Sequence, residues 1–420
     1  MRTAAVLLLL AGLSAPVSAQ VTGNVALTFD VLPDLQPESG NQQVSELRLR
    51  VFAERGVDWG EHVRLQAAGY VDALLADRTA LGEPGATTDA IVRPTELYAD
   101  FTAARFDVRA GMSRIVWGRL DEFQPTDVVN PIDLTRFLLD GRSEARLPVA
   151  LVRGRVFVTS VSALEMVVVP TFRASRFDQL DEPSSPFNLA RIDSLAVQRD
   201  RPSGLSAVQG GGRFSSTFRR LDWGVSAYRG FRTFPTITLD LPTASLRESF
   251  PRFTMIGGDV ETVRGPWGVR GEVAAFVDDE LQSTRAARGV PGRSVEAGAG
   301  LDRRAGDYRV AANVLWSWRE VDPQDPFAAV LEGDDEVNGS DLSLVVVTDR
   351  SFVRETRTLR GLAVIDPADG TAFGRVIAAV SLRDNTWVEG SAGIFAGSSP
   401  DTIGRLTRRD FLYLRLKVFF

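Results

Sequence analysis

Apolar and polar residues alternate at every second position through long stretches of this chain. Between residues 46 and 54, apolar side chains fill the odd positions, and the even positions are mostly charged, as at Arg48 and Arg50. Period two is the pattern of a β-strand whose two faces differ. The charged face suits water and the apolar face suits hydrocarbon. The same alternation returns in 62–72, 307–319 and 412–420.

These alternating runs last about 9 to 13 residues, which exceeds the roughly 5–6 residues usual for strands in globular proteins. A strand tilted across a bilayer needs roughly 9–11 residues. A soluble β-sandwich also alternates, but the lengths favour membrane-crossing strands. Because backbone polar groups in lipid must be bonded within the protein, such strands have to close into a barrel. The sequence therefore predicts an all-β fold, a transmembrane antiparallel β-barrel.

The alternating runs predict about eighteen strands. They fall near 22–32, 44–55, 62–73, 95–103, 105–112, 148–158, 162–172, 205–218, 221–231, 252–262, 267–277, 294–302, 307–318, 341–349, 356–365, 372–383, 386–397 and 409–420. From a periplasmic N-terminus, short turns alternate with longer outer loops, as in bacterial barrels. The longer connections are 33–43, 74–94, 113–147, 173–204, 232–251, 278–293, 319–340 and 398–408. Merging two weak strands within 341–365 would give about 16 strands instead.

The composition excludes several kinds of site. The chain has no Cys and one His, with 48 Lys+Arg against 54 Asp+Glu and a formal charge of −6. Disulfides, thiolate metal sites and cysteine catalysis are excluded, and the charge gives no indication of nucleic-acid binding. Lys417 is the only lysine, which argues against Schiff-base catalysis. We predict no cofactor and no metal site.

The first residues have the pattern of a secretory signal peptide. Arg2 precedes an apolar run from Ala4 to Leu13, and Val17-Ser18-Ala19 supplies small residues before Gln20. Cleavage is predicted after residue 19, so that 1–19 is removed and 20–420 forms the barrel. A transmembrane helix would need about 20 apolar residues, and this run is shorter.

The C-terminal residues 413–420 alternate and end on an aromatic side chain, Phe420. This segment resembles the last strand of bacterial outer-membrane proteins, whose terminal aromatic residue is recognised by the barrel assembly machinery. The resemblance implies a bacterial outer-membrane location, with outer-membrane lipid and lipopolysaccharide as the surroundings. It also implies that Phe420 is the assembly signal.

The connection 113–147 is too long and too apolar for a freely solvated loop. Gln124-Pro125-Thr126 and Asn130-Pro131-Ile132-Asp133 are turn signals, because a residue before proline avoids the helical region. Asp133 could cap a short helix through Leu139, whose apolar side chains would need a surface to pack against. We therefore expect 113–147 to fold inward onto the barrel wall.

This connection resembles the third outer loop of bacterial outer-membrane porins, which folds into the lumen and narrows it. Residues 111–133 are similar to a porin-like family whose segment runs Gly-Arg-Gln, then Trp-Gly, then Asn-Pro-x-Asp. This chain has Trp117-Gly118 and Asn130-Pro131-Ile132-Asp133, whereas Met112 and Ser113 stand where the family has Arg and Gln. The resemblance implies a porin-like channel in which Trp117, Gly118, Asn130 and Pro131 structure the loop.

If the loop enters the lumen, its charged side chains are candidates to line a constriction, where charge and size select solutes. They are Arg114, Arg119, Asp121, Glu122, Asp127, Asp133 and Arg136. The inward faces of the strands add further arginines: Arg48, Arg50, Arg64, Arg109, Arg153, Arg155, Arg270, Arg309, Arg360, Arg375 and Arg383. The alternative is that these charges only pair with lumen carboxylates and hold the loop in place.

Enzymatic functions find little support in the sequence. His62 is the only histidine and falls near a short turn, far from the outer loops, whereas a nucleophile and its base must lie within hydrogen-bond reach. Two functions remain open. The first is a channel for passive or selective diffusion of small polar or charged solutes. The second is a closed barrel with a structural, adhesive or partner-binding role through its outer loops. The oligomeric state stays open.

Overall fold

The computed structural model describes residues 21–32, 44–77, 86–135, 137–176, 196–398, 403–407 and 409–420. The predicted signal peptide 1–19 and Arg136 lie outside this part of the chain. The strands are β1 (Thr22–Leu32), β2 (Val44–Trp59), β3 (Val63–Asp77), β4 (Ala86–Thr102), β5 (Phe106–Ser113), β6 (Val149–Thr159), β7 (Ser162–Val169), β8 (Ala196–Asp200), β9 (Gln209–Phe218), β10 (Leu221–Phe231), β11 (Thr236–Asp240), β12 (Ser245–Ser249), β13 (Arg252–Arg264), β14 (Trp267–Ser283), β15 (Arg288–Ala305), β16 (Tyr308–Val321), β17 (Gly339–Phe352), β18 (Arg357–Asp366), β19 (Thr371–Arg383), β20 (Thr386–Ala396) and β21 (Phe411–Phe419).

The helices among the described residues are short: α2 (Phe137–Asp140), α3 (Arg142–Ala145) and the 3-10 turns η2 (Gly204–Ala207) and η3 (Gly404–Leu406). None of these described helices has the length and apolar character to cross a membrane.

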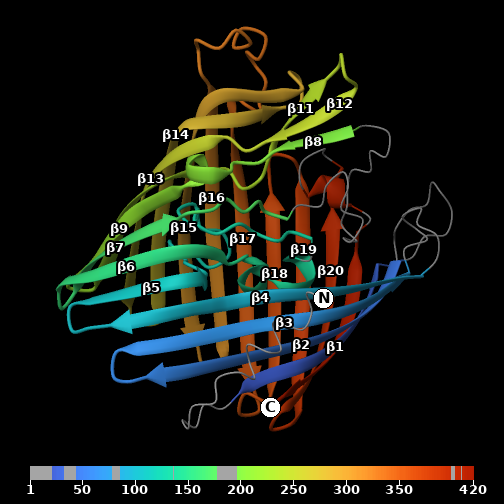
Figure 1. The fold of residues 1–420 in the computed structure, drawn as a ribbon. Helices are drawn as coiled ribbons and strands as arrows, with labels where there is room; N and C mark the ends of the chain where they lie inside the picture. The colour runs from blue at the N-terminus through green and yellow to red at the C-terminus, as the bar shows by residue number, and fades with distance from the viewer. Residues whose placement is uncertain are drawn as a thin grey trace.

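Eighteen strands form one antiparallel sheet that closes on itself (Figure 1). Neighbours in sequence are neighbours in the sheet, except that β7 pairs with β9 and β10 pairs with β13. The barrel closes where β1 pairs with β21, from Asn24 opposite Phe419 to Val31 opposite Leu412. The predicted barrel of eighteen strands is therefore confirmed. The alternative of 16 strands is wrong, because 341–365 contains parts of two separate strands, β17 and β18.

The two faces of the barrel wall differ as the alternation predicted. In β2, Leu47 and Leu49 point outward and are 40% and 42% exposed, whereas Glu46 and Arg48 point inward and are 1% and 3% exposed. In β21 the outward Leu412, Leu414 and Leu416 are likewise exposed. Apolar side chains that stand exposed around a closed barrel form a surface suited to hydrocarbon.

Short turns and long connections lie at opposite ends of the barrel. At one end, the hairpins β2–β3, β13–β14 and β15–β16 turn through Gly60, Gly265 and Gly306, whose φ angles of 70°, 59° and 60° favour glycine. The described parts of the predicted long connections lie at the other end, whereas the expected loop 33–43 lies outside the described residues. Two of the expected loops are largely strand. In 74–94, β3 runs to Asp77 and β4 begins at Ala86. The expected loop 278–293 is mostly strand, because β14 runs to Ser283 and β15 begins at Arg288.

A second sheet, of three strands, stands at the long-connection end (top of Figure 1). It consists of β11 and β12, from the predicted loop 232–251, and β8, from the predicted loop 173–204. β8 lies parallel to β12, with Ala196 opposite Ser245. The period-two pattern did not reveal these strands because each has only five residues, and their pairing joins distant parts of the chain.

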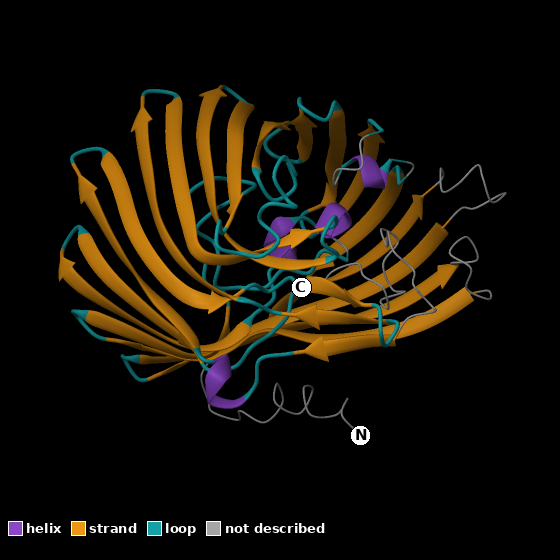
Figure 2. Ribbon diagram, turned by 90° about the horizontal axis from the view of Figure 1, so that it is seen from above, coloured by secondary structure: helices purple, strands orange, loops and turns teal. Residues whose placement is uncertain are grey.

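The connection between β5 and β6, residues 114–148, is called the inner segment below. Loops and short helices lie inside the ring of strands when the barrel is viewed along its axis (Figure 2). A short helix that contains Leu139 is present as α2, but the expectation that Asp133 caps it is wrong. Asp133 instead forms an isolated bridge with Arg176, and its carboxylate accepts a hydrogen bond from the Thr135 backbone N–H at 3.1 Å. The described helix begins at Phe137.

Candidate functional site

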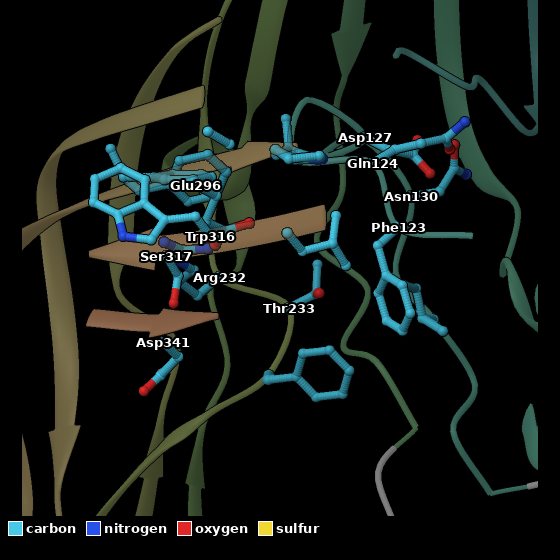
Figure 3. Close-up of a pocket in the computed structure, with 18 of the residues that line it drawn as sticks. Phe123, Gln124, Asp127, Asn130, Arg232, Thr233, Glu296, Trp316, Ser317 and Asp341 are labelled. Atoms are coloured by element: carbon cyan, nitrogen blue, oxygen red, sulfur yellow. The ribbon is translucent and has the colours of Figure 1, made fainter. Parts of the chain in front are cut away.

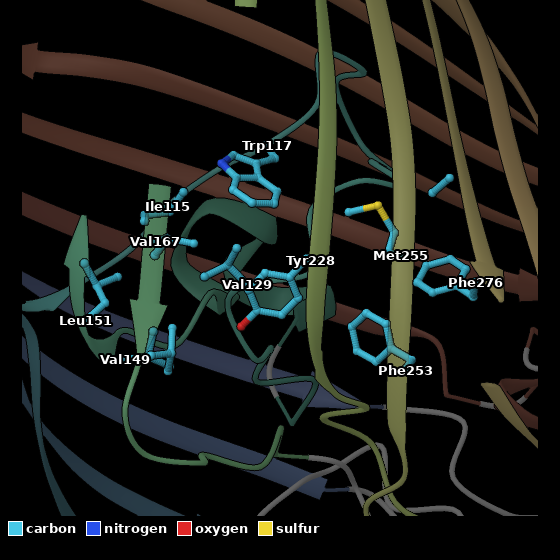
Figure 4. Packing of buried hydrophobic residues seen from close by; sticks show 12 residues of the cluster. Ile115, Trp117, Val129, Val149, Leu151, Val167, Tyr228, Phe253, Met255 and Phe276 are labelled. Carbon is cyan, nitrogen blue, oxygen red and sulfur yellow. The ribbon is translucent and has the colours of Figure 1, made fainter. Parts of the chain in front are cut away.

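An apolar cluster fixes the start of the inner segment to the wall. Ile115, Trp117 and Val129 pack with inward side chains of β6, β7, β10, β13 and β14 (Figure 4). Trp117 is 1% exposed, and its ring meets the edge of Tyr228 at a centroid distance of 5.9 Å. Its indole N–H donates to Glu165 Oε1 at 2.8 Å, which satisfies the one polar group of this buried side chain.

Asn130 joins the two ends of the inner segment. Its Oδ1 accepts a hydrogen bond from the Ile115 backbone N–H at 2.7 Å, and its Nδ2 donates to the Leu147 carbonyl at 2.9 Å. The Pro131 carbonyl accepts a further bond from the Leu147 N–H at 2.8 Å. An amide side chain is suited to this position because it accepts and donates at once.

Glu272 on β14 is the principal polar anchor of the inner segment. Its Oε2 accepts hydrogen bonds from the backbone N–H groups of Arg119 and Leu120, at 2.9 and 3.3 Å. Its Oε1 accepts from the Thr126 N–H and hydroxyl, both at 2.8 Å. The carboxylate is 4% exposed, and four donors are arranged around it. Such bonds to an ionised acceptor are stronger than neutral ones.

Gly118 permits this approach. Its φ is +91°, and an added Cβ would lie only 2.4 Å from Glu272 Oε1.

We therefore expect Gly118→Ala to lower the free energy of unfolding by about 1–3 kcal/mol, since the new methyl group must displace the carboxylate and strain the backbone. Urea unfolding in lipid vesicles measures the loss. Gly154→Ala is the matched control, because no atom lies within 4 Å of its Cβ position and its φ is not left-handed. Equal losses in both variants would show that the close approach is unimportant.

The charged residues that follow Gly118 pair with the wall of β13 to β18. Arg119 binds Asp259 at 2.6 Å and Glu261 at 3.0 Å. Asp121 pairs with Arg270 at 3.3 Å and also with Arg309, and Glu122 pairs with Arg360. These contacts bring together predicted loop residues and predicted strand arginines.

The far end of the inner segment is anchored to the opposite part of the wall. Asp140 of α2 accepts hydrogen bonds from Arg48 Nη1 at 2.7 Å and from Arg415 Nη2 at 3.1 Å, and Glu144 pairs with Arg50 at 2.6 Å. Burial alone would raise the pKa of Asp140, but the neighbouring arginines outweigh it and hold that pKa well below its usual range. The stabilisation is thus complete above the ordinary aspartate pKa of about 3.9 and is lost only as the pH falls through the lower, folded-state value.

Three more predicted residues of the inner segment have ionic partners, whereas the predicted strand arginines Arg375 and Arg383 form no ion pair among the described residues. Asp127 pairs with Arg146, Asp133 with Arg93 and Arg176, and Arg114 with Glu96. Four predicted strand arginines pair with carboxylates of the wall instead of the inner segment: Arg109 with Asp100, Arg153 and Arg155 with Asp107, and Arg64 with Asp58 at 3.8 Å.

Several residues of this site were not predicted as pore-lining. Asp140 and Glu144 fall inside the connection 113–147, but no pattern in the sequence distinguished them from its other charged residues. Asp259 follows Gly257 and Gly258, which interrupt the alternation of apolar and polar residues in that strand. Arg415 and Lys417 stand on the polar face of the last strand, so their strand parity could have identified them. His62, the only histidine, lies at the short-turn end with Nδ1 at 2.9 Å from the Thr102 carbonyl.

Two adjacent cavities lie between the inner segment and the wall. The first, of about 330 Å³, is lined by residues of β1 to β4 and β21 together with Arg114 and Glu144. The second, of about 490 Å³, lies between residues 116–146 of the segment and the inward faces of β18 to β21. They share three lining residues, Glu144, Arg415 and Lys417. Charged side chains make up about half of the residues that line the two cavities.

No protein-family model matches the sequence, and no curated protein matches it. Solved structures match over nearly the whole chain. OccK7 (OpdD) of Pseudomonas aeruginosa aligns with a TM-score of 0.53 and 11% identity, over 96% of this chain and 99% of that chain. The BenF-like porin of Pseudomonas fluorescens Pf-5 gives 0.52 and 9%, over 96% and 98%. Pseudomonas aeruginosa OpdK, solved with vanillate, gives 0.50 and 12%, over 96% and 98%. At these identities the likeness concerns the fold, and by fold this chain is similar to porin β-barrels along almost its full length.

Proposed function

We propose that the protein is a bacterial outer-membrane channel for small polar or charged solutes, constricted by its inner segment. The two adjacent cavities that share Glu144, Arg415 and Lys417 carry this proposal. The porin-like fold supports it, as does the apolar outward face. In this proposal residues 111–133 correspond to the inward loop of the porin-like family, and the predicted constriction residues shape the passage through their ion pairs.

The passage offers a solute few unpaired charges. Of the charged side chains that line the two cavities, only Arg375 and Lys417 make no ion pair within the described residues. Arg375 donates instead to Ser391, Tyr413 and the Leu139 carbonyl, and Lys417 lies over the Phe419 ring at 5.1 Å. Unpaired charge in a narrow lumen sets ion preference.

The first experiment is single-channel conductance of the refolded protein in a planar bilayer, with reversal potentials under a salt gradient. Stable current steps are the expected result. A silent bilayer from demonstrably folded barrel would instead favour a closed barrel with a structural, adhesive or partner-binding role.

Lys417→Glu should shift the permeability ratio toward cations by roughly threefold or more, since the change replaces an unpaired positive charge in both cavities by a negative one. The reversal potential measures this shift. Arg220→Glu makes the same charge change in an exposed turn that lines neither cavity, and it should leave the ratio unchanged. Equal shifts in both variants would contradict the proposed route.

We further propose that the outward apolar surface contacts outer-membrane lipid and lipopolysaccharide. We also propose that Phe420 is the signal that the barrel assembly machinery recognises. Phe420 continues the β1–β21 pairing, because it exchanges two backbone hydrogen bonds with Gly23, both at 3.0 Å. Removal of Phe420 should lower the amount of folded barrel recovered from outer membranes.

A further inference from the structure

A third cavity, called the outer pocket here, lies at the long-connection end of the barrel, on another section of the wall. Its volume is about 360 Å³. Residues 123–132 of the inner segment form one side. Phe231 at the end of β10 and the three residues that follow it form another. The inward faces of β13 to β17 complete it, and Figure 3 shows Glu296, Ser317 and Asp341 on this wall.

The outer pocket contains one carboxylate without a partner. Four of its lining residues are titratable, and three of them are neutralised. Asp127 pairs with Arg146 at 2.6 Å, Asp341 pairs with Arg319, and Arg232 Nε donates to Asp279 at 2.8 Å. The fourth, Glu296, makes no hydrogen bond or ion pair within the part of the chain that the structure describes. In its ionised form Glu296 therefore gives the outer pocket one negative charge that no hydrogen bond or ion pair offsets, although Arg232 and Arg319 act on it electrostatically from a longer distance.

The surroundings of Glu296 combine hydroxyl groups with aromatic rings. Ser317 stands opposite Glu296 in the β15–β16 register, and Ser343 and Thr233 also line the pocket. Five phenylalanines add apolar surface: Phe123, Phe231, Phe234, Phe253 and Phe276. Phe123 is 40% exposed, and its ring extends from the inner segment beside the pocket (Figure 3).

An anion is poorly suited to this pocket. Arg232 is its only cationic lining residue, and that guanidinium is already bound to Asp279 and lies 4.0 Å from the Phe276 ring centre. An anion would therefore meet an occupied arginine and the unpaired Glu296. A cation would neutralise that carboxylate, whose isolation from a partner is costly in a low-dielectric site.

We propose that the outer pocket binds a solute that carries a protonated amine or guanidinium group and an aromatic or other apolar body. The cationic group bonds to Glu296 and the adjacent hydroxyls, while the body packs on Phe123 and its neighbours. As a statement about a transported substrate, the assignment rests on the proposed channel function. As a statement about binding, it stands on the pocket alone.

The test is calorimetric titration of the folded, detergent-solubilised protein with three probes that share a phenyl ring. These are phenethylammonium, phenylacetate and benzyl alcohol, which are cationic, anionic and neutral. We expect phenethylammonium to bind at least about tenfold more tightly than the other two, and Glu296→Gln to remove this preference. Glu332→Gln removes one carboxylate from an exposed loop outside the pocket and should keep it.

Equal binding of phenethylammonium to Glu296→Gln and the parent protein would overturn the assignment, as would a preference for phenylacetate. Single-channel conductance distinguishes an error in the proposed pocket ligand from an error in the proposed channel function. Stable current steps without charge-selective binding would reject the pocket and retain the channel. Charge-selective binding to a protein that gives no current would retain the pocket and reject the channel.

Discussion

Replacement of residues 119–140 by a short glycine-serine linker should raise single-channel conductance severalfold. The exchange removes most of the residues by which the inner segment lines the second cavity. It also removes the contacts of the segment with Glu272, with Asp259 and with Arg48, the partner of Asp140. Conductance rises with the cross-section left open to ions, and a segment inside the lumen limits that cross-section. Planar-bilayer recordings of both proteins under the same salt give the ratio.

A suitable control shortens a connection outside the two cavities. Residues 323–336 of the connection between β16 and β17 line neither of them, so their replacement by the same linker should leave conductance near that of the parent protein. If both exchanges give the parent conductance, the inner segment does not constrict the passage.

Glu272→Ala is the single substitution with the largest expected effect. It leaves the N–H groups of Arg119, Leu120 and Thr126, and the Thr126 hydroxyl, without their acceptor. Each buried donor left unpaired costs about 1–3 kcal/mol, so the local loss exceeds the strength of any one remaining ion pair. We therefore expect residues 118–126 to detach from the wall. Single-channel currents should become larger and noisier, and an added protease should cleave the chain within 118–126.

The matched control for this substitution lies on the same strand. Glu280 of β14 accepts a hydrogen bond from the Thr236 hydroxyl at 2.7 Å. Among the described residues it makes no hydrogen bond or ion pair with the inner segment, because it lies near the long-connection end of the strand. Glu280→Ala should keep quiet currents and resistance to protease in 118–126. Quiet currents in Glu272→Ala as well would show that the apolar cluster around Trp117 holds the segment without the carboxylate.

The barrel was predictable because its strands alternate over whole membrane-crossing lengths. Each outward Leu in β2 or β21 is separated from the next by one inward residue, so the two faces can be read directly. The sheet of β8, β11 and β12 was not predictable, because five residues give too little periodicity and β8 reaches β12 across more than forty residues of chain.

The sequence predicted several residues that the barrel wall contributes to the candidate site, but not which residues of the inner segment pair with them. Parity placed Arg48 and Arg50 on the inward face, and both contact the inner segment through Asp140 and Glu144. Their partners could not be paired from sequence, because the path of the segment depends on Gly118, Asn130 and the apolar cluster together. The position of Glu272 beside the backbone N–H groups of Arg119, Leu120 and Thr126 arises only in the folded chain.

The attachment of Asp140 also spans the junction between the first and last strands. Arg48 of β2 and Arg415 of β21 stand on either side of Thr28 of β1, and all three occupy one rung of the sheet. Asp140 binds both arginines, so it connects β2 and β21 across β1, at the junction where the barrel closes. Arg48 and Arg415 come close together only when β1 has paired with both β2 and β21. The complete contact of Asp140 with both arginines therefore requires the closed barrel.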